Sequence, residues 1–317
     1  MSDLFKVYVA DGQEYFVYNK NDKPTKVSFP FSQSLLDLLY LDMSAYDDMF
    51  AEMSTAVQKL YTTRDDRFGE RVKELLEGLS KVHIYFEFML VDWTQRLDDI
   101  RHKDNIGIME LLPYKKKLAQ CPNTLRAAQA QIRAMLEQVL DITTPDKPIS
   151  EKMVKYSTPK DGNDERIFRF TAQTTTLEII DKKTFCEVLY PSNIYDIIEF
   201  FARECVKREQ RFRICKNCDK YFALTGYINA EYCDRVFDEQ GHTCKEMGAL
   251  NVWQKKAKKP AYELYSKEYK KRFARIKYGK ISKEDFYAWA EKAREMRDKC
   301  MADEMEYEKF QEWIAVS

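Results

Sequence analysis

Residues 214–244 read ICKNCDKYFALTGYINAEYCDRVFDEQGHTC and hold four of the eight cysteines of this 317-residue chain. Two residues separate Cys215 from Cys218, fourteen more precede Cys233, and ten separate Cys233 from Cys244. Two cysteines at the shorter spacing can aim both thiolates from one tight turn at a tetrahedral ion about 2.3 Å away. We therefore predict that the four cysteines bind one structural zinc ion.

The residues around the cysteines favour a small zinc ribbon. The sequence KYF at 220–222 suits a strand of a hairpin that covers the metal. Thr243 and Glu246 stand in the T-x-x-E relation of a capping box, which places Cys244 in the first turn of a helix, where a thiolate is favoured. Two alternatives stay open: four buried free cysteines, and His242 in place of Cys244 as the fourth ligand.

The composition predicts a globular, mainly helical protein with more than one part. Hydrophobic residues make up 44% of the chain, and it has only nine glycines and nine prolines. A chain of this length does not need a metal merely to fold. We predict an α+β, predominantly α-helical fold in three parts: a mixed N-terminal domain at 1–205, a four-cysteine zinc ribbon at 206–259, and a helical tail, basic and then acidic, at 260–317.

The expected location is the cytoplasm. The opening residues, MSDLFKVYVADGQEYF, lack the basic start, apolar core and cleavage site of a signal peptide. No apolar run approaches the roughly 20 residues that span a bilayer, so we expect no membrane partner. In a reducing compartment, clustered cysteines are metal ligands more often than disulfide partners.

Two β-hairpins are expected in the mixed domain. The sequence LFKVYVADGQEYFVYN alternates apolar and polar residues around Asp11–Gly12, a strong hairpin signal. The second hairpin is expected where EKMVKYSTP (151–159) and RIFRFTAQTTTLEII (166–180) flank KDGNDE (160–165).

Helices are expected over most of the remaining chain. The apolar spacing predicts a helical region at about 111–140 with an interruption near Cys121–Pro122. Ser192 or Asn193 is expected to cap a helix that leads into the cysteines, and Ser282 to cap one that follows a stop at Gly279.

The charges are sorted along the chain although the 52 basic and 52 acidic residues balance. Residues 29–58 contain no lysine or arginine but five acidic residues, and residues 250–280 contain eleven basic residues and two acidic ones. Such a basic segment is the electrostatic footprint of phosphate contacts, so we predict nucleic-acid binding. The predicted contact residues are Lys255, Lys256, Lys258, Lys259, Lys267, Lys270, Lys271, Arg272, Arg275 and Lys277.

Other interpretations of these segments stay open. A lysine-rich helix is often merely solvated, and the acidic segment 29–58 is most simply a solvated helix face. The acidic segment is also a candidate contact for the basic tail, for a second copy of the chain or for another protein. Tyr262, Tyr265, Tyr269 and Phe273 follow one helical face and are expected to be core residues.

The run CKNCDKYFALTGYINAEYCDR (215–235), followed by TCKEMG (243–248), resembles the C-terminal zinc fingers of bacterial CGNR-type proteins. It looks closer still to a poorly characterised group of Firmicutes proteins with a C-terminal cysteine ribbon, often encoded near phage or mobile-element genes. In that group a helix leads into the ribbon and a basic helical tail follows it. The resemblance covers roughly residues 195–300 and implies the four cysteines as ligands and a DNA-binding regulator.

A weaker resemblance concerns catalysis. In RLDDIRH (96–102), an arginine is followed six positions later by a histidine, which resembles the motif of the all-helical HEPN ribonucleases. This resemblance implies RNA cleavage by Arg96 and His102. No P-loop, Rossmann glycine pattern or nucleophile motif is present. The favoured interpretation is a zinc-containing nucleic-acid-binding regulator or phage- or mobile-element-associated factor; the alternatives are a HEPN-like ribonuclease and a protein-interaction factor in phage defence or counter-defence.

Overall fold

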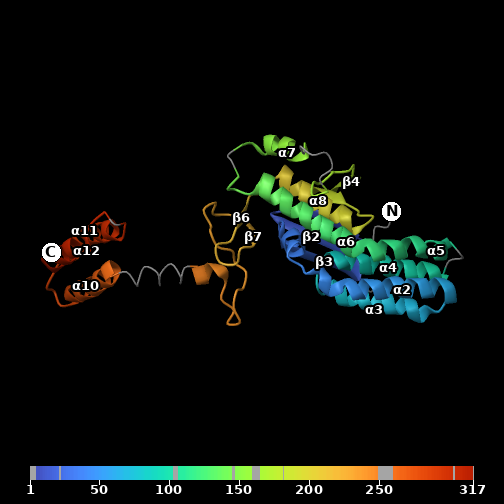
Figure 1. Ribbon diagram of the computed structural model, residues 1–317, viewed down its shortest axis with the longest axis horizontal. Coiled ribbons are helices and arrows are strands. Elements are labelled where there is room, and N and C mark those ends of the chain that lie inside the picture. The colour runs from blue at the N-terminus through green and yellow to red at the C-terminus, as the bar shows by residue number, and fades with distance from the viewer. Residues whose placement is uncertain are drawn as a thin grey trace. The chain divides into compact units, whose positions relative to one another are not determined.

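A computed structural model describes residues 5–20, 23–102, 106–144, 147–158, 165–180, 182–248, 260–302 and 304–316 (Figure 1). The chain divides into two compact units. The first comprises Met1–Arg213 and Tyr221–Asn229, and the second comprises Ile214–Lys220 and Ala230–Ser317. The three-part division expected from the sequence stays a prediction.

A five-stranded antiparallel sheet organises the first unit. Its strands are β1 (Phe5–Ala10), β2 (Gln13–Lys20), β3 (Lys23–Pro30), β4 (Thr175–Ile180) and β5 (Thr184–Leu189). They lie in the order β3-β2-β1-β5-β4, so the central strand β1 pairs with β5, Val7 lying opposite Leu189. The predicted first hairpin is confirmed: Asp11 and Gly12 connect β1 and β2 with φ of 49° and 70°, the positive values that a two-residue type I′ turn requires.

The second predicted hairpin was misplaced. Residues 151–157, expected as a strand, belong to helix α7 (Ile149–Ser157), whose buried residues Ile149, Lys152 and Tyr156 follow helical and not strand spacing. The real hairpin joins β4 to β5, with Ile180 paired to Thr184. Residues 159–164, the centre of the predicted turn, lie outside the described residues.

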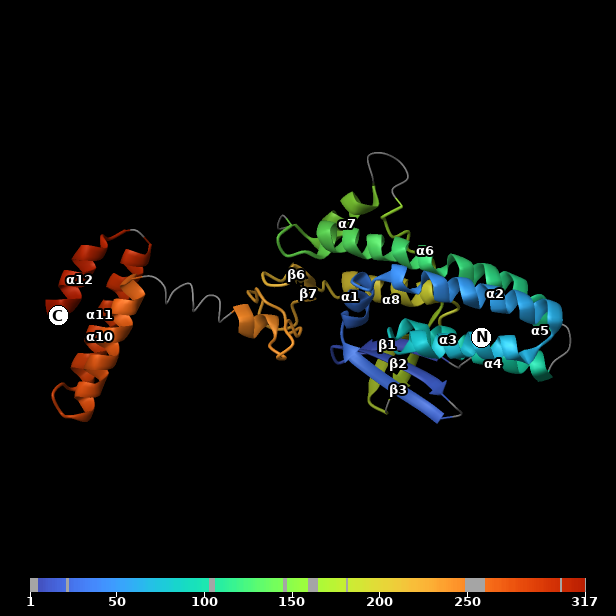
Figure 2. The ribbon, with the colours of Figure 1, turned by 60° about the horizontal axis from the view of Figure 1, so that its bottom comes forward.

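Helices cover one face of the sheet, as Figure 2 shows for β1, β2 and β3. Val7, Val9 and Phe16 point into the main core together with helical residues, whereas Tyr8 and Val188 form a smaller cluster on the opposite face. Besides α7, the helical elements of this unit are α1 (Gln33–Leu39), η1 (Met43–Tyr46), α2 (Asp47–Thr63), α3 (Asp66–Ser80), α4 (Tyr85–His102), α5 (Ile106–Met109), α6 (Leu111–Met135), η2 (Leu136–Leu140) and α8 (Ile194–Lys207).

Helix α6 is continuous through Pro122, contrary to the predicted interruption. A proline removes one backbone hydrogen bond and costs a helix about 3 kcal/mol. Here Leu118, Cys121 and Leu125 are buried in the main core next to it. Tertiary packing of this face therefore outweighs the local preference of the proline.

Further along the chain lie the short strands β6 (Phe212–Ile214) and β7 (Tyr221–Ala223), which pair. The helices α10 (Pro260–Lys277), α11 (Lys283–Met301) and α12 (Tyr307–Val316) follow them. Tyr265 of α10, Ala293 of α11 and Phe310 of α12 share a small core. The predicted cap of α11 at Ser282 and the predicted end of α10 at Gly279, whose φ is 65°, are confirmed. Of the two candidate caps for α8, Asn193 is the cap, and its side chain takes part in a capping box.

The predicted α+β, predominantly helical class is confirmed. An antiparallel sheet with hairpins occupies the N-terminal part, and helices dominate the C-terminal region. Among the described residues, none of the helices has the length and apolar character that crossing a bilayer demands.

A buried carboxylate ties β2 to the start of α1. Glu14 is fully buried; its Oε1 accepts a hydrogen bond from the N–H of Ser32 (2.8 Å) and its Oε2 one from the N–H of Ser34 (3.1 Å). Ser32 has a positive φ of 71°. Burial raises the pKa of Glu14 to about 8, although the hydrogen bonds from Ser34 and Ser32 oppose this.

The neighbouring histidine is buried and neutral. Nε2 of His83 lies 3.0 Å from the carbonyl oxygen of Ser34, so it donates, and Nδ1 accepts from the N–H of Tyr85 at 3.2 Å. Burial lowers the pKa of His83 to about 4. Glu87, four residues after His83, is 3% exposed, and its Oε1 lies 2.7 Å from Nζ of Lys20. These contacts show that His83 and Glu87 both form part of the packed interior of the first unit.

We expect Glu14→Gln to flatten the pH dependence of stability between pH 6.5 and 8. Because the folded-state pKa of Glu14, about 8, exceeds its ordinary value of 4.5, the folded protein retains a proton that the unfolded chain releases. The free energy of unfolding of the wild type therefore falls as pH rises through this window, by on the order of 1–2 kcal/mol. His83 acts in the opposite sense, but only below its ordinary value of 6.5.

Urea unfolding at several pH values, followed by far-UV circular dichroism, measures this difference. Glutamine mimics the protonated acid and does not titrate, so it is the matched variant. Parallel pH profiles for the two proteins would show that Glu14 does not titrate in this window.

Candidate metal centre

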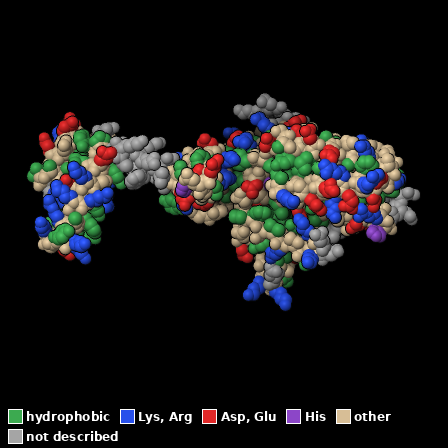
Figure 3. All heavy atoms as spheres, turned by 90° about the horizontal axis from the view of Figure 1, so that it is seen from below, with side chains coloured by type: hydrophobic (Ala, Val, Ile, Leu, Met, Phe, Trp, Pro, Cys, Tyr) green, Lys and Arg blue, Asp and Glu red, His purple; other side chains and the backbone are tan. Residues whose placement is uncertain are grey.

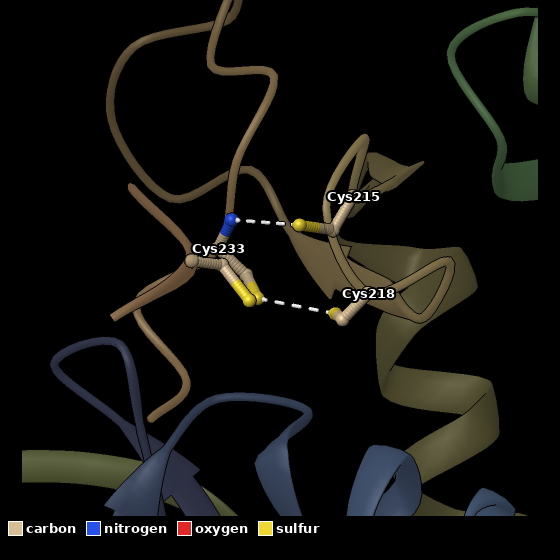
Figure 4. Close-up of side chains that lie close together, drawn as sticks. Cys215, Cys218 and Cys233 are labelled. Carbon is tan, nitrogen blue, oxygen red and sulfur yellow. Dashed lines mark hydrogen bonds between the residues drawn. The ribbon is translucent and has the colours of Figure 1, made fainter. Parts of the chain in front are cut away.

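The four predicted cysteines converge. The sulfur atoms of Cys215, Cys218, Cys233 and Cys244 all lie within 4.8 Å of one another. Figure 4 shows three of them, with the sulfurs of Cys218 and Cys233 3.8 Å apart. Tetrahedral coordination with Zn–S distances of about 2.3 Å places sulfurs about 3.8 Å apart. The arrangement therefore fits one metal ion held by four thiolates.

The first two ligands sit on a tight knuckle between β6 and β7. The N–H of Cys215 donates to the carbonyl of Lys220, and the N–H of Asp219 to the carbonyl of Cys215, both at 3.0 Å. Asp219, directly after Cys218, has a φ of 54°, a left-handed conformation that β-branched residues avoid. The chain can turn back at once after the second ligand because Asp219 accepts this conformation.

The strands that lead into and out of the knuckle are rooted in the first unit. Phe212 and Tyr221 are buried in its main core. Phe212 accepts a hydrogen bond from the N–H of Ile142 (3.0 Å), and the N–H of Tyr221 donates to the hydroxyl of Tyr40 (2.5 Å). The two residues Phe212 and Tyr221, between which the knuckle runs along the chain, are therefore both held in the core of the first unit.

A second turn explains the ten-residue spacing between Cys233 and Cys244. Val236 and Thr243 form an antiparallel bridge, and the N–H of Phe237 donates to the carbonyl of His242 at 2.8 Å. The N–H of Cys244 donates to the carbonyl of Arg235 at 2.9 Å. The intervening residues therefore fold back as a hairpin-like loop that returns Cys244 to Cys233.

His242 has another role in this loop. Its Nδ1 lies 2.7 Å from Oδ2 of Asp238, and its N–H donates to Oδ1 of the same carboxylate at 2.9 Å. The hydrogen bond to Asp238 raises the pKa of the exposed His242. The structure thus places Cys244, and not His242, beside the other three cysteines.

The predicted capping box at Thr243 is confirmed. The hydroxyl of Thr243 accepts from the N–H of Glu246 (3.3 Å), and the Glu246 carboxylate accepts from the N–H of Thr243 (2.7 Å). Residues 244–248 are helical, so Cys244 lies at a helix start. The free N–H groups of a first helical turn favour a negatively charged sulfur there.

Hydrogen-bond donors surround the sulfurs. Burial would raise the pKa of Cys215, but the backbone N–H groups of Cys233, Asn217 and Cys218 lower it to about 7. The guanidinium of Arg235 lies 3.7 Å from the sulfur of Cys233. Such donors offset the net negative charge that four thiolates and one divalent cation leave behind.

The pKa values of two other thiols in the cluster shift in the opposite direction. Burial raises the pKa of Cys233 to about 12, and burial also raises that of Cys244. The amide Nδ2 of Asn217 is buried without a hydrogen-bond partner, and the Asn217 side chain opposes the rise in the pKa of Cys244. A coordinated cation deprotonates such thiols outright.

Two contacts that the sequence interpretation missed hold the centre together. Lys216 joins the knuckle to the second loop: its N–H donates to the carbonyl of Glu231 (3.0 Å), and its Nζ lies 2.6 Å from the Glu231 carboxylate. Gly248 packs under the ring of Tyr232, where an added Cβ would lie 2.4 Å from a ring carbon. The opposite charges of Lys216 and Glu231 are visible in the sequence and could have indicated their ion pair. The need for glycine at position 248 arises from the contact with the Tyr232 ring, which the sequence alone does not reveal.

The residues predicted to bind nucleic acid fall into two groups. Lys255, Lys256, Lys258 and Lys259 lie outside the described residues. On α10, the exposed members are Lys267, Lys270, Lys271, Arg275 and Lys277. Arg272 is partly buried: its guanidinium lies 4.5 Å from the ring centroid of Trp289.

The two candidate nuclease residues have different partners. Arg96 pairs with Asp92 (2.9 Å) and Glu110 (3.1 Å) and lies over the ring of Tyr114. His102 is exposed at the end of α4, and its Nδ1 lies 2.9 Å from the carbonyl oxygen of Asp98. Ribonuclease activity stays a prediction without geometric support from these contacts.

Acidic residues of the segment 29–58 already have partners in the first unit. Asp47 accepts a hydrogen bond from the Arg126 guanidinium at 2.6 Å, and Glu52 accepts one from the Arg71 guanidinium at 2.7 Å. The side chain of Asp42 caps the start of η1. These contacts agree with a solvated helix face. Contact of the segment with the tail, another copy or another protein stays a prediction.

Comparison with known proteins finds a family that matches part of the chain. A protein family described as a family of unknown function (DUF6076) matches residues 170–315. No curated protein and no solved structure matches the chain. The matched range includes the four cysteines and helices α10–α12, and the description assigns no activity to either.

We expect the purified protein to contain one zinc ion per chain and Cys218→Ser to contain far less. A serine hydroxyl is a poor substitute for a soft thiolate, and the three remaining sulfurs leave the shell open. Elemental analysis of both proteins checks this, with Cys300→Ser as a control outside the cluster. Equal zinc contents in wild type and Cys218→Ser would contradict the site.

At Asp219, valine should weaken zinc binding and glycine should retain it. A β-branched residue at positive φ costs the knuckle roughly 1–2 kcal/mol, equivalent to about a fivefold to thirtyfold loss of affinity. Competition with a chromophoric chelator measures the two affinities. Equal values for Asp219→Val and Asp219→Gly would mean that the turn at this residue does not limit metal binding.

Proposed function

We propose that this is a zinc-containing nucleic-acid-binding protein in which the four-cysteine centre is structural and α10 contacts phosphates. The observation that supports this most directly is the exposed basic face of α10. The proposal includes a role for the protein as a DNA-binding regulator or as a phage- or mobile-element-associated factor. This part rests on the resemblance of residues 195–300 to the CGNR-type and cysteine-ribbon proteins.

The four-cysteine donor set supports a structural and not a catalytic part for the metal. Four protein thiolates fill the tetrahedral shell of zinc and leave no position for water. The ion would cross-link the knuckle at Cys215 and Cys218 to the loop that carries Cys233 and the helix start at Cys244. When bound, zinc supplies this cross-link and the charge that keeps the thiols ionised.

Helix α10 divides into an apolar and a basic face. On the apolar face, Tyr265 is buried. The ring centroids of Tyr269 and Phe273 lie 5.1 and 5.6 Å from that of Phe286 on α11. On the exposed side, Lys267, Lys271 and Arg275 follow at intervals of four residues and therefore form one row.

Most of this charge is available to a ligand. Lys271 pairs with Glu268 at 3.2 Å, and Lys270 lies beside the row, three residues after Lys267. Figure 3 shows Lys and Arg side chains gathered on one part of the C-terminal helical body. Neighbouring lysines on one helix face repel each other. Phosphates relieve this repulsion by neutralising the lysines, which in turn displace the counterions condensed on the nucleic acid.

Reversing the charge of Lys270, Lys271 and Arg275 to glutamate should weaken nucleic-acid binding and reduce its salt dependence. Each lost phosphate contact lowers the slope of log affinity against log salt by roughly 0.9 for duplex DNA. Titration of the full-length, zinc-replete protein against labelled DNA and RNA at several salt concentrations measures affinity and slope together.

The matched control reverses three exposed lysines of the first unit, Lys81, Lys116 and Lys183. This control should bind as the wild type does. Absence of any binding by the wild type at low salt would overturn the proposed function, and equal losses in both triple variants would show that α10 has no special part in it.

A further inference from the structure

Two aromatic rings of the α10–α11 hairpin are exposed and yet held in place. Phe273 on α10 is 54% exposed, and Tyr287 on α11 is 61% exposed. Both rings contact Phe286, which is only 1% exposed, at centroid distances of 5.6 and 5.5 Å. A buried ring thus supports two exposed rings, which lowers the entropy that they lose when a ligand binds.

The support extends along α10. The ring of Tyr269 stacks on Phe273 with an interplanar angle of 4° and a centroid distance of 6.3 Å, and it also contacts Phe286. Phe273 therefore touches two other rings on its inner side and offers its remaining surface to solvent.

Cations flank these rings. Lys270 and Lys277 lie three residues before and four after Phe273, so they share its side of α10. Lys283 lies four residues before Tyr287 on α11, and all three lysines are exposed. Two carboxylates, Glu284 and Glu291, also neighbour Tyr287 on α11. Their helical spacing places them around the helix on one flank of Tyr287, whereas Lys283 lies on the other flank. The positive charge is therefore greatest on the side of Phe273.

We propose that Phe273 and Tyr287 stack on unpaired bases while Lys270, Lys277 and Lys283 contact the adjoining phosphates. The ligand class is single-stranded nucleic acid. Bases of a duplex already stack on each other, whereas every unpaired base offers a free π-face to an exposed ring. This inference rests on the proposed function and names its substrate class.

The test compares a labelled single-stranded oligonucleotide with the duplex of the same length, using full-length, zinc-replete protein. The wild type should bind the single strand more tightly. Phe273→Leu keeps an apolar contact with Phe286 but removes the π-face, and it should bind the single strand at least about fivefold more weakly, with little change for the duplex.

A second pair of variants separates stacking from folding. Tyr287→Phe retains the ring and should bind as the wild type does, whereas Tyr287→Ser should lose single-strand affinity. Tyr227→Ser, at a tyrosine 74% exposed in the first unit, is the matched control and should have no effect. Circular dichroism verifies that each variant keeps its helical content.

The outcomes are distinguishable. Equal binding of both strand types, with Phe273→Leu and Tyr287→Ser unchanged, would overturn base stacking and leave phosphate binding by α10 intact. Loss of single-strand binding in Tyr287→Phe as well as Tyr287→Ser would also count against stacking, because phenylalanine keeps the ring. No binding of either strand type by the wild type would overturn the proposed function itself.

Discussion

Four sulfur atoms within 4.8 Å of one another cannot all ionise unless a cation lies among them. This constraint governs the segment from the knuckle to residue 248, whose regular structure is limited to short pieces. The donors that face the sulfurs, Arg235 and the amides around Cys215, are arranged for negative charge. A divalent metal at this position would replace the mutual repulsion of the thiolates by attraction and would hold both loops together.

The two units differ in what stabilises them. The first buries a large continuous core around a five-stranded sheet, and even its polar groups at Glu14 and His83 are satisfied by neighbouring hydrogen bonds. In the second unit, the cysteine segment has polar loops, and α10–α12 share only a small cluster around Tyr265 and Phe310. Removal of a metal ion bound by the cysteines would therefore act on the cysteine segment far more than on the sheet and its helices.

Local signals in the sequence were sufficient for several features of the fold and the site. The turn at Asp11–Gly12, the capping boxes at Asn193 and Thr243 and the convergence of the cysteines depend on residues close together in the chain. The alternation of β2 also placed Glu14 on the same side as Phe16, so its burial had a visible signal. Where packing decided the outcome, as at Pro122 and in α7, local preference was wrong. The pairing of β1 with β5 joins residues too far apart for any local pattern to predict.

That long-range pairing has a consequence for how the chain is made. Val7 of β1 lies opposite Leu189 of β5, so during synthesis from the N-terminus the central strand keeps an open edge until about three-fifths of this sequence has been translated. An unpaired edge attracts other strands, which makes this interval the time when the nascent chain is most vulnerable to wrong pairing. All four cysteines are translated after β5, so the strands of the sheet are complete before the first ligand is made.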